Sequence, residues 1–257
     1  MKLHCIPILS ALFTSLVCFS NPATKISDNS PSSGIVIRWN DCEQTIDGFG
    51  IAQAGWAKEL FAFKNRKQVM DKMFGNDGLR LNILRGEIFP HYWENKEDKD
   101  FNLNDDINIE LCDSDFNNKS DDLLRRGQLW LTLEAKNKYH INKLVFSTWS
   151  APAWMKSNGK VSNGKLKPEC YQDFANYLAA FYKAYKSKGI TPYAISPSNE
   201  PGYAAPWNSS LWTADEMGKF ITSNLGPTFQ KENIPAKIIF GENPLWSVVM
   251  PLSLIHI

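Results

Sequence analysis

The sequence has few residues of the kinds that build disulfide frameworks or metal sites. Its 257 residues include 5 cysteines and 4 histidines. Two of the cysteines lie in the first twenty residues, which are interpreted below as a signal peptide. The other three, Cys42, Cys112 and Cys170, stand at wide, irregular spacing, which gives no disulfide framework and at most one bridge. The histidines show no ligand spacing; they stand at positions 4, 91, 140 and 256. We therefore expect no bound metal and no cofactor.

The chain also lacks an excess of charge of either sign. It carries 28 basic and 27 acidic residues, a formal net charge of +1, and no long basic run. Nucleic acid and anionic membrane surfaces are therefore not expected partners. Hydrophobic residues, by contrast, make up 43% of the chain and aromatic residues 12%, enough for one large domain with a substantial core. The expected partner is weakly charged or neutral.

The N-terminus predicts export. Lys2 supplies a positive end, residues 6–19 form an apolar stretch, and small Ser20 precedes a polar segment, a pattern typical of a signal peptide over residues 1–20. The stretch is short and contains Pro7, which speaks against a transmembrane anchor, and no later apolar run is long enough to cross a bilayer. We expect a secreted, periplasmic or cell-surface protein that associates with a membrane only if Cys18 is lipidated.

The rest of the chain alternates between strand and helix patterns. Residues 21–34, rich in Ser, Asn and Pro, predict a flexible leader, and order is expected from residue 35. Strand patterns lie at 44–49, 79–88, 143–148, 193–196 and 237–241. Helical patterns lie between them at 56–74, 120–139 and 168–188, and a Thr-x-x-Glu capping box at Thr213 and Glu216 starts another. Strands separated by helices predict parallel pairing.

Five such units fit either an open doubly wound sheet or an incomplete eight-stranded barrel. A dinucleotide site is not expected, because GFGIAQAG lacks the third glycine at the required spacing. The motifs GFG, LRGEIFP, STWSAPAW and SPSNEP all fall at the carboxyl ends of strands. Barrel enzymes build their sites on that face, so the barrel is favoured.

The side chains at these strand ends suit a sugar. Trp149, Tyr203 and Trp207 offer flat apolar faces, and Arg85 and Asn199 offer hydrogen bonds to hydroxyl groups. Cleavage of a glycosidic bond also needs a proton donor at the leaving oxygen and a second carboxylate at the developing positive centre. Glu200, in SPSNEP, suits the donor because Pro201 stiffens the turn that carries it.

Several motifs together resemble glycoside hydrolase family 30. They run in order from about residue 35 to residue 246: QTIDGFG, ILR, WSAPAWMKSNG with KLKPECYQDFANYL, ISPSNEP and WTADEMGKFI. The resemblance implies a retaining glycosidase on a (β/α)8 TIM barrel, with a side β-domain built partly from the N-terminal strand. The substrates it implies are β-linked glucosides, xylans, β-1,6-glucans or galactans.

The same resemblance implies roles for individual residues. Glu200 is expected to be the general acid/base, and Asn199 to bind the hydroxyl next to the anomeric carbon. Arg85, Trp149 and Trp56 are expected to line the subsite of the attacked sugar. Two departures weaken any assignment to a subfamily: Ile51 stands where a second glycine is usual after GFG, and Ser198 precedes Asn199 where Gln is common.

The sequence does not identify the second carboxylate that the reaction needs. The family nucleophile is a Glu at the end of the seventh strand, further past the acid/base than this sequence extends. Glu242, in FGENPLW, ends the fifth strand, and we expect a substrate-lining or structural role for it. The tail PLSLIHI, residues 251–257, looks like translated adaptor sequence. We therefore expect residues 35–250 to be a partial, inactive catalytic barrel whose full-length parent is the enzyme.

Two alternatives stay open. A non-catalytic carbohydrate-binding barrel would keep the aromatic residues and need no nucleophile. A doubly wound protein would use Glu200 as a structural ion-pair partner.

Overall fold

The computed structural model describes residues 40–41, 45–53, 56–93, 96–97 and 127–242. The expected signal peptide, leader, first strand of the side β-domain and adaptor-like tail therefore lie outside the described residues, as does most of the polar stretch after residue 93. The described residues from 46 to 242 belong to one compact unit, which carries the fold. None of the described helices has the length and apolar character needed to cross a bilayer.

The described residues contain one sheet of five parallel strands, arranged in the order in which they occur along the chain. They are β1 (Gly50–Ala52), β2 (Ile83–Ile88), β3 (Lys143–Thr148), β4 (Ala194–Ser196) and β5 (Lys237–Ile238). A doubly wound sheet reverses its strand order at a switch point. The strictly sequential order belongs instead to the wall of a (β/α) barrel, so the doubly wound alternative is wrong.

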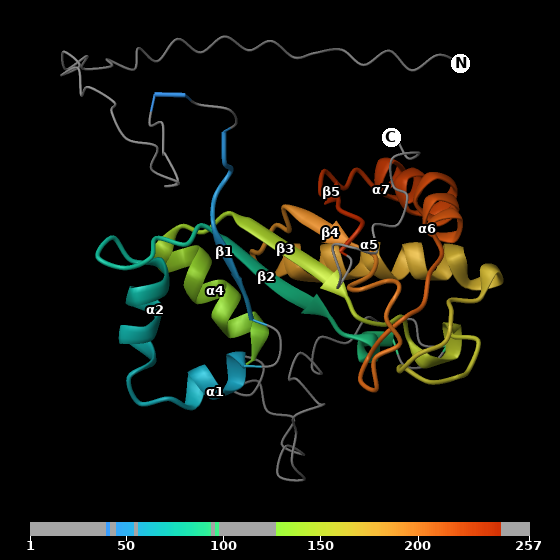
Figure 1. Ribbon diagram of the computed structural model, residues 1–257, viewed down its shortest axis with the longest axis horizontal. Coiled ribbons are helices and arrows are strands. Elements are labelled where there is room, and N and C mark those ends of the chain that lie inside the picture. The colour runs from blue at the N-terminus through green and yellow to red at the C-terminus, as the bar shows by residue number, and fades with distance from the viewer. Residues whose placement is uncertain (1–39, 42–44, 54–55, 94–95, 98–126, 243–257) are drawn as a thin grey trace, which may run out of the picture. The chain divides into compact units, whose positions relative to one another are not determined.

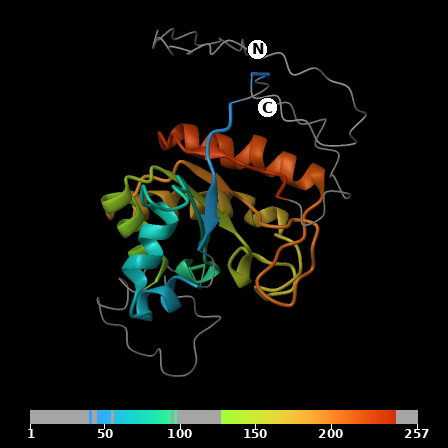
Figure 2. The ribbon, with the colours of Figure 1, turned by 60° about the vertical axis from the view of Figure 1, so that its left-hand side comes forward.

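Helices flank this sheet in chain order (Figures 1 and 2). Helices α1 (Ala57–Ala62) and α2 (Arg66–Phe74) pack on α4 (Gln128–Tyr139), which also contacts β2. Helix α5 (Tyr171–Ser187) packs against the π-helical turn η7 (Ile221–Leu225) and α7 (Gly226–Lys231), and α6 (Ala214–Phe220) leads into that turn. Short 3-10 turns are η1 (Pro90–Trp93), η5 (Ala153–Met155) and η6 (Pro168–Cys170).

The aromatic face of α5 forms the core behind β3, as its periodicity predicts. Phe181 and Tyr185 are fully buried and lie 4.2 Å apart between ring centroids. The ring of Phe146 on β3 packs on both, at 5.1 and 4.9 Å. Because aromatic burial dominates core energetics, this cluster holds the middle strands in place against α5.

Buried Gln128, the first residue of α4, connects β2 to α5 at a level of the sheet that β1 does not reach. Its side-chain carbonyl accepts the Glu87 N–H at 2.6 Å, and its amide group donates to the Glu87 carbonyl at 2.7 Å and to the Tyr185 hydroxyl at 2.9 Å. Since β1 pairs with β2 only as far as Arg85, this side chain satisfies backbone groups that a longer β1 would have paired.

Several predicted elements have different bounds in the structure. The strand expected at 237–241 ends at Ile238. Residues 44–49 were expected to form a strand, but the described part of that segment is irregular and pairing begins at Gly50. The single helix expected over 56–74 is interrupted at Phe63, whose backbone is extended. The strand expected from residue 79 starts at Ile83, because the amides of Leu79 and Leu81 bond to carbonyls near the end of α2, at 2.8 and 2.9 Å.

Other predictions are confirmed. The strand at 143–148 has the expected bounds. The capping box is present at the start of α6: the Glu216 N–H donates to Thr213 Oγ1 at 3.2 Å, and the Thr213 N–H donates to Glu216 Oε2 at 2.8 Å. Gly226 and Pro227 begin α7 directly after the π-helical turn, and the backbone at Gly226 is helical.

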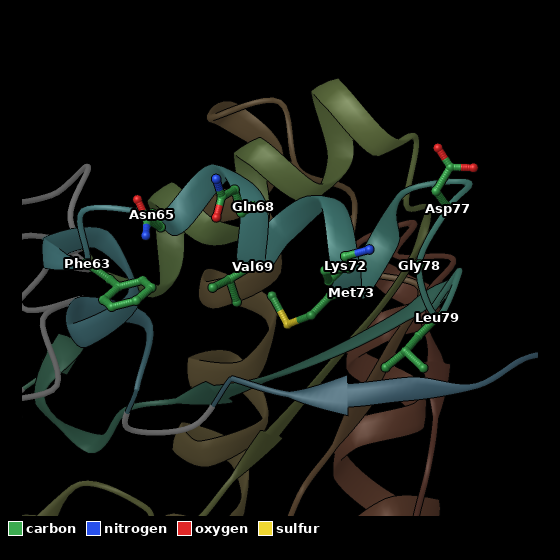
Figure 3. Close-up of a pocket in the computed structure, with 9 residues that line it drawn as sticks. All are labelled: Phe63, Asn65, Gln68, Val69, Lys72, Met73, Asp77, Gly78 and Leu79. Atoms are coloured by element: carbon green, nitrogen blue, oxygen red, sulfur yellow. The ribbon is translucent and has the colours of Figure 1, made fainter.

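An apolar hollow of about 770 Å³ lies beside α2 (Figure 3). Its apolar side is formed by Phe63, Val69, Met73 and Leu79. None of the residues predicted to act on a sugar lines it, so this hollow is not the predicted site.

The loop after β3 contains a completely buried lysine. Lys156 donates to the Ser150 hydroxyl at 3.0 Å and to the Ser209 carbonyl at 2.6 Å. No ion pair joins it to a carboxylate in the described residues. Burial lowers the pKa of Lys156 from 10.5 to about 8, because desolvation disfavours the charged ammonium.

This lowered pKa predicts a pH dependence of stability. Between about pH 8 and pH 10.5 the unfolded chain binds more protons at Lys156 than the folded chain, so stability rises with pH across that window. Relative to Lys156→Met, the free energy of unfolding of the unchanged protein should rise by on the order of 3 kcal/mol across it. Urea unfolding at a series of pH values measures the difference, and a difference that does not vary with pH would contradict the prediction.

Candidate active site

The carboxyl ends of β2 to β5 gather the predicted site residues. Arg85 lies on β2, Trp149 directly follows β3, and Asn199 and Glu200 follow β4. The Asn199 N–H donates to the Thr148 carbonyl at 2.6 Å, and Asn199 also forms a parallel bridge with Glu242. The peptide after β4 is therefore held between the ends of its two neighbouring strands.

Glu242 is the centre of the polar contacts at this edge. Its Oε1 accepts from Arg85 Nε at 3.1 Å and lies 3.0 Å from Arg85 Nη2. Its Oε2 accepts from the hydroxyls of Ser147 at 2.6 Å and Ser196 at 2.7 Å. Both carboxylate oxygens are thus occupied by donors from three other strands, an arrangement in which the carboxylate is fixed in place and paired.

Arg85 connects Glu242 to two predicted sugar-binding residues. Its Nη2 donates to Asn199 Oδ1 at 2.7 Å, which leaves the Asn199 amide group as a donor for a ligand. Its guanidinium lies over the Trp149 ring, 4.6 Å from the ring centroid. The structure therefore brings Arg85, Asn199 and Trp149 together, as expected from their places at neighbouring strand ends.

Glu200 occupies an unusual backbone conformation beside this cluster. Its φ is +46°, in the left-handed region that non-glycine residues seldom adopt. Its N–H donates to the Glu242 carbonyl at 3.0 Å, and its own carbonyl accepts from the Tyr203 N–H at 2.9 Å. The side chain is half-buried, and the described residues supply no hydrogen bond or ion pair to its carboxylate. Strained residues with a free polar group concentrate at functional sites.

The remaining predicted residues make no side-chain hydrogen bond or ring contact with this cluster in the described part of the chain. Trp56 is half-buried after β1, and its Nε1 donates to the Ala52 carbonyl at 2.6 Å. Tyr203 and Trp207 are 44% and 49% exposed and lie 6.2 Å apart between ring centroids. They form an exposed aromatic pair on the loop that follows Glu200.

Sequence reasoning missed the two serines that hold Glu242. Ser147 and Ser196 are fully buried on β3 and β4. The available signal was a hydroxyl near the end of a strand otherwise composed of apolar residues, a common pattern that does not name its partner. Across the described residues, no group of three or more His, Cys, Asp and Glu side chains is placed to hold a metal.

Comparison with known proteins agrees with this architecture. Residues 46–240 match the glycosyl hydrolase family 30 TIM-barrel domain. The sheet of five described strands is part of the wall of such a (β/α) barrel. The chain belongs to glycosyl hydrolase family 30, whose members are glycosidases.

Individual relatives carry different substrate names. The chain is 30% identical over 200 residues to putative glucosylceramidase 3 of Caenorhabditis elegans, covering 74% of this chain and 37% of that protein. It is 28% identical over 237 residues to the endo-1,6-beta-D-glucanase of Neurospora crassa, covering 85% and 45%. The catalytic domain of a family 30 xylanase C from Talaromyces cellulolyticus superposes with a TM-score of 0.66 at 25% identity, covering 82% and 50%. The chain thus spans half or less of the length of these relatives.

The polar cluster predicts a measurable coupling between Arg85 and Glu242. Removing either partner leaves the other partly buried charge unpaired, so the two substitutions should not add. A double-mutant cycle of Arg85→Met and Glu242→Gln, followed by urea unfolding, should give a coupling energy of about 2 kcal/mol.

The matched control is the exposed pair of Lys183 and Glu232, whose charged atoms lie 2.6 Å apart. Its cycle, Lys183→Met with Glu232→Gln, should give a much smaller coupling energy because solvent screens the pair. Equal coupling energies in the two cycles would show that the Arg85–Glu242 pair has no special part in the fold.

Proposed function

We propose that this protein hydrolyses a β-linked glycan, a glucan or a xylan, with Glu200 as the general acid/base. The observation that carries the proposal is the arrangement after β4. Glu200 has a strained backbone and a free, half-buried carboxylate, next to an Asn199 that Arg85 orients. The membership of the family and the names of the relatives support the substrate class.

In the proposed reaction Glu200 first protonates the oxygen of the leaving group. Its carboxylate then removes a proton from the water that completes hydrolysis. Asn199 donates from its amide to the hydroxyl beside the anomeric carbon, and Trp149 and Trp56 offer apolar faces to the attacked sugar. Tyr203 and Trp207 offer further faces on the loop that follows the acid/base. Arg85 keeps Asn199 and Trp149 in position through its guanidinium.

A retaining reaction also needs a carboxylate nucleophile. We do not assign this role to Glu242, because its two oxygens already accept from Arg85, Ser147 and Ser196. Glu242 is better suited to positioning Arg85. Since the described residues offer no second free carboxylate beside Glu200, we propose that the 257-residue chain alone does not turn over substrate.

A carbohydrate-binding function is the second candidate. The exposed pair of Tyr203 and Trp207 would support binding without a nucleophile. Export to the cell surface or medium, proposed from the pattern of residues 1–20, suits either function because glycans are accessible there.

The test compares Glu200→Gln with the unchanged protein, both in the 257-residue chain and in the whole open reading frame that contains it. In the protein from the whole open reading frame, release of reducing sugar from xylan and from β-1,6-glucan should fall about 100-fold or more in the variant, because the amide cannot supply a proton. The 257-residue chain should release no sugar in either form. Aryl β-glycosides with highly acidic leaving groups should lose less in their glycosylation step, since such groups depart with little protonation.

The matched control is Glu169→Gln, which removes an exposed carboxylate elsewhere on the surface and should leave the rate unchanged. Unchanged hydrolysis by Glu200→Gln would remove Glu200 from the chemistry. Binding of either glycan without turnover by the protein from the whole reading frame would favour the carbohydrate-binding function.

A further inference from the structure

The loops after β3 and β4 are joined to each other beside the candidate site. Residues 156–166 fold back on themselves through an antiparallel bridge between Lys156 and Leu166. The far end of this loop then pairs with the loop after β4 through a bridge between Ser162 and Asn208. Two backbone hydrogen bonds extend that pairing, from Ser209 to Val161 at 3.0 Å and from Leu211 to Gly164 at 2.9 Å.

Lys156 makes a second connection between the same two loops. Its ammonium group donates to Ser150 at the start of the first loop and to the Ser209 carbonyl in the second. Ser209 is used twice more, because its hydroxyl accepts from the Asn163 N–H at 2.9 Å and donates to the Ala205 carbonyl at 3.0 Å. The lysine therefore reaches the segment at which the two loops meet.

The positions of these partners tie the lysine to the candidate site. Ser150 directly follows Trp149, and Ser209 stands two residues after Trp207. The two segments that Lys156 joins thus carry the predicted aromatic residues of the loops after β3 and β4. Glu200 lies between those segments in the chain.

The free-energy cost of burying the Lys156 ammonium group indicates that its hydrogen bonds have a specific role. A fully buried ammonium without a carboxylate partner is unfavourable, and burial lowers its pKa to about 8. An apolar side chain of similar length would avoid this cost but could not donate to a hydroxyl and a carbonyl on two different segments. Lys156 also takes no part in the proposed proton transfers, so its contacts are the feature to explain.

We propose that Lys156 is a positioning residue that clamps the loop after β3 to the loop after β4 and thereby sets the separation of Trp149 from the Tyr203–Trp207 pair. The clamp itself follows from the contacts of Lys156. Its effect on substrate binding rests on the proposed function.

The clamp is tested first by amide hydrogen exchange, followed by NMR, in the 257-residue chain. Lys156→Met should speed exchange of the Asn163, Ser209 and Leu211 amides about tenfold or more, because these bonds close the contact between the loops. The amides of Phe146 and Ile195 in the sheet should keep their rates. Lys160→Met removes an exposed lysine of the same loop and is the matched control, which should change none of these rates.

A second variant covers the case in which Lys156→Met does not fold. Ser150→Ala removes one acceptor of the clamp and leaves the lysine in place, so it should speed exchange of the same loop amides by a smaller factor. If the loop amides of every folded variant exchange as slowly as those of Lys160→Met, the clamp is overturned.

The effect on the site is tested in the protein from the whole open reading frame. If that protein hydrolyses xylotetraose or β-1,6-glucotetraose, Lys156→Met should raise KM about fivefold or more with a smaller change in kcat, since the aromatic faces are displaced and Glu200 is not. Faster loop exchange with unchanged KM would limit Lys156 to a structural role and overturn the positioning claim. Absence of hydrolysis by the unchanged protein would count against the proposed function, while the exchange rates still decide the clamp.

Discussion

The paired carboxylate of Glu242 is the constraint on which the candidate site depends. A carboxylate at the interior edge of a barrel wall is stable only when its charge and its lone pairs are satisfied. Arg85, Ser147 and Ser196 supply the donors, one from each of the three preceding strands. The strand ends must therefore stay in register. Arg85, held by Glu242, donates to Asn199 and lies over Trp149, so the positions of these two side chains are coupled to this one interaction.

Two carboxylates meet at this edge of the sheet and their surroundings give them different capacities. The backbone N–H of Glu200 donates to the backbone carbonyl of Glu242, so the two residues are neighbours. The Glu242 carboxylate is saturated by hydrogen bonds and a cation, which leaves it without a free lone pair aimed at a ligand. The Glu200 carboxylate is half-buried and has no partner among the described residues. Environment, more than residue type, separates a carboxylate that is paired within the protein from one that is open to a ligand.

The sequence predicts the repetitive parts of this structure and the grouping of residues at strand ends. The strand at 143–148, the aromatic face of α5 and the capping box at Thr213 are set by local patterns that the folded chain keeps. Arg85, Asn199 and Trp149 could be grouped because the carboxyl ends of parallel strands share one edge.

Elements decided by tertiary contacts were less accessible to sequence reasoning. The interruption at Phe63 and the late start of β2 depend on where α2 ends and which amides its last carbonyls accept. Lys156 resembles any other lysine in a polar loop until its burial is seen. The loop after β4 bears the exposed pair of Tyr203 and Trp207, and Trp149 begins the loop after β3, while the polar centre lies at the strand ends. The relatives carry names for different substrates, and loops vary among homologues more than the strands that they join. Under the proposed function, choice among glycans is therefore better sought in the loop contacts around Lys156 than in the cluster at Glu242.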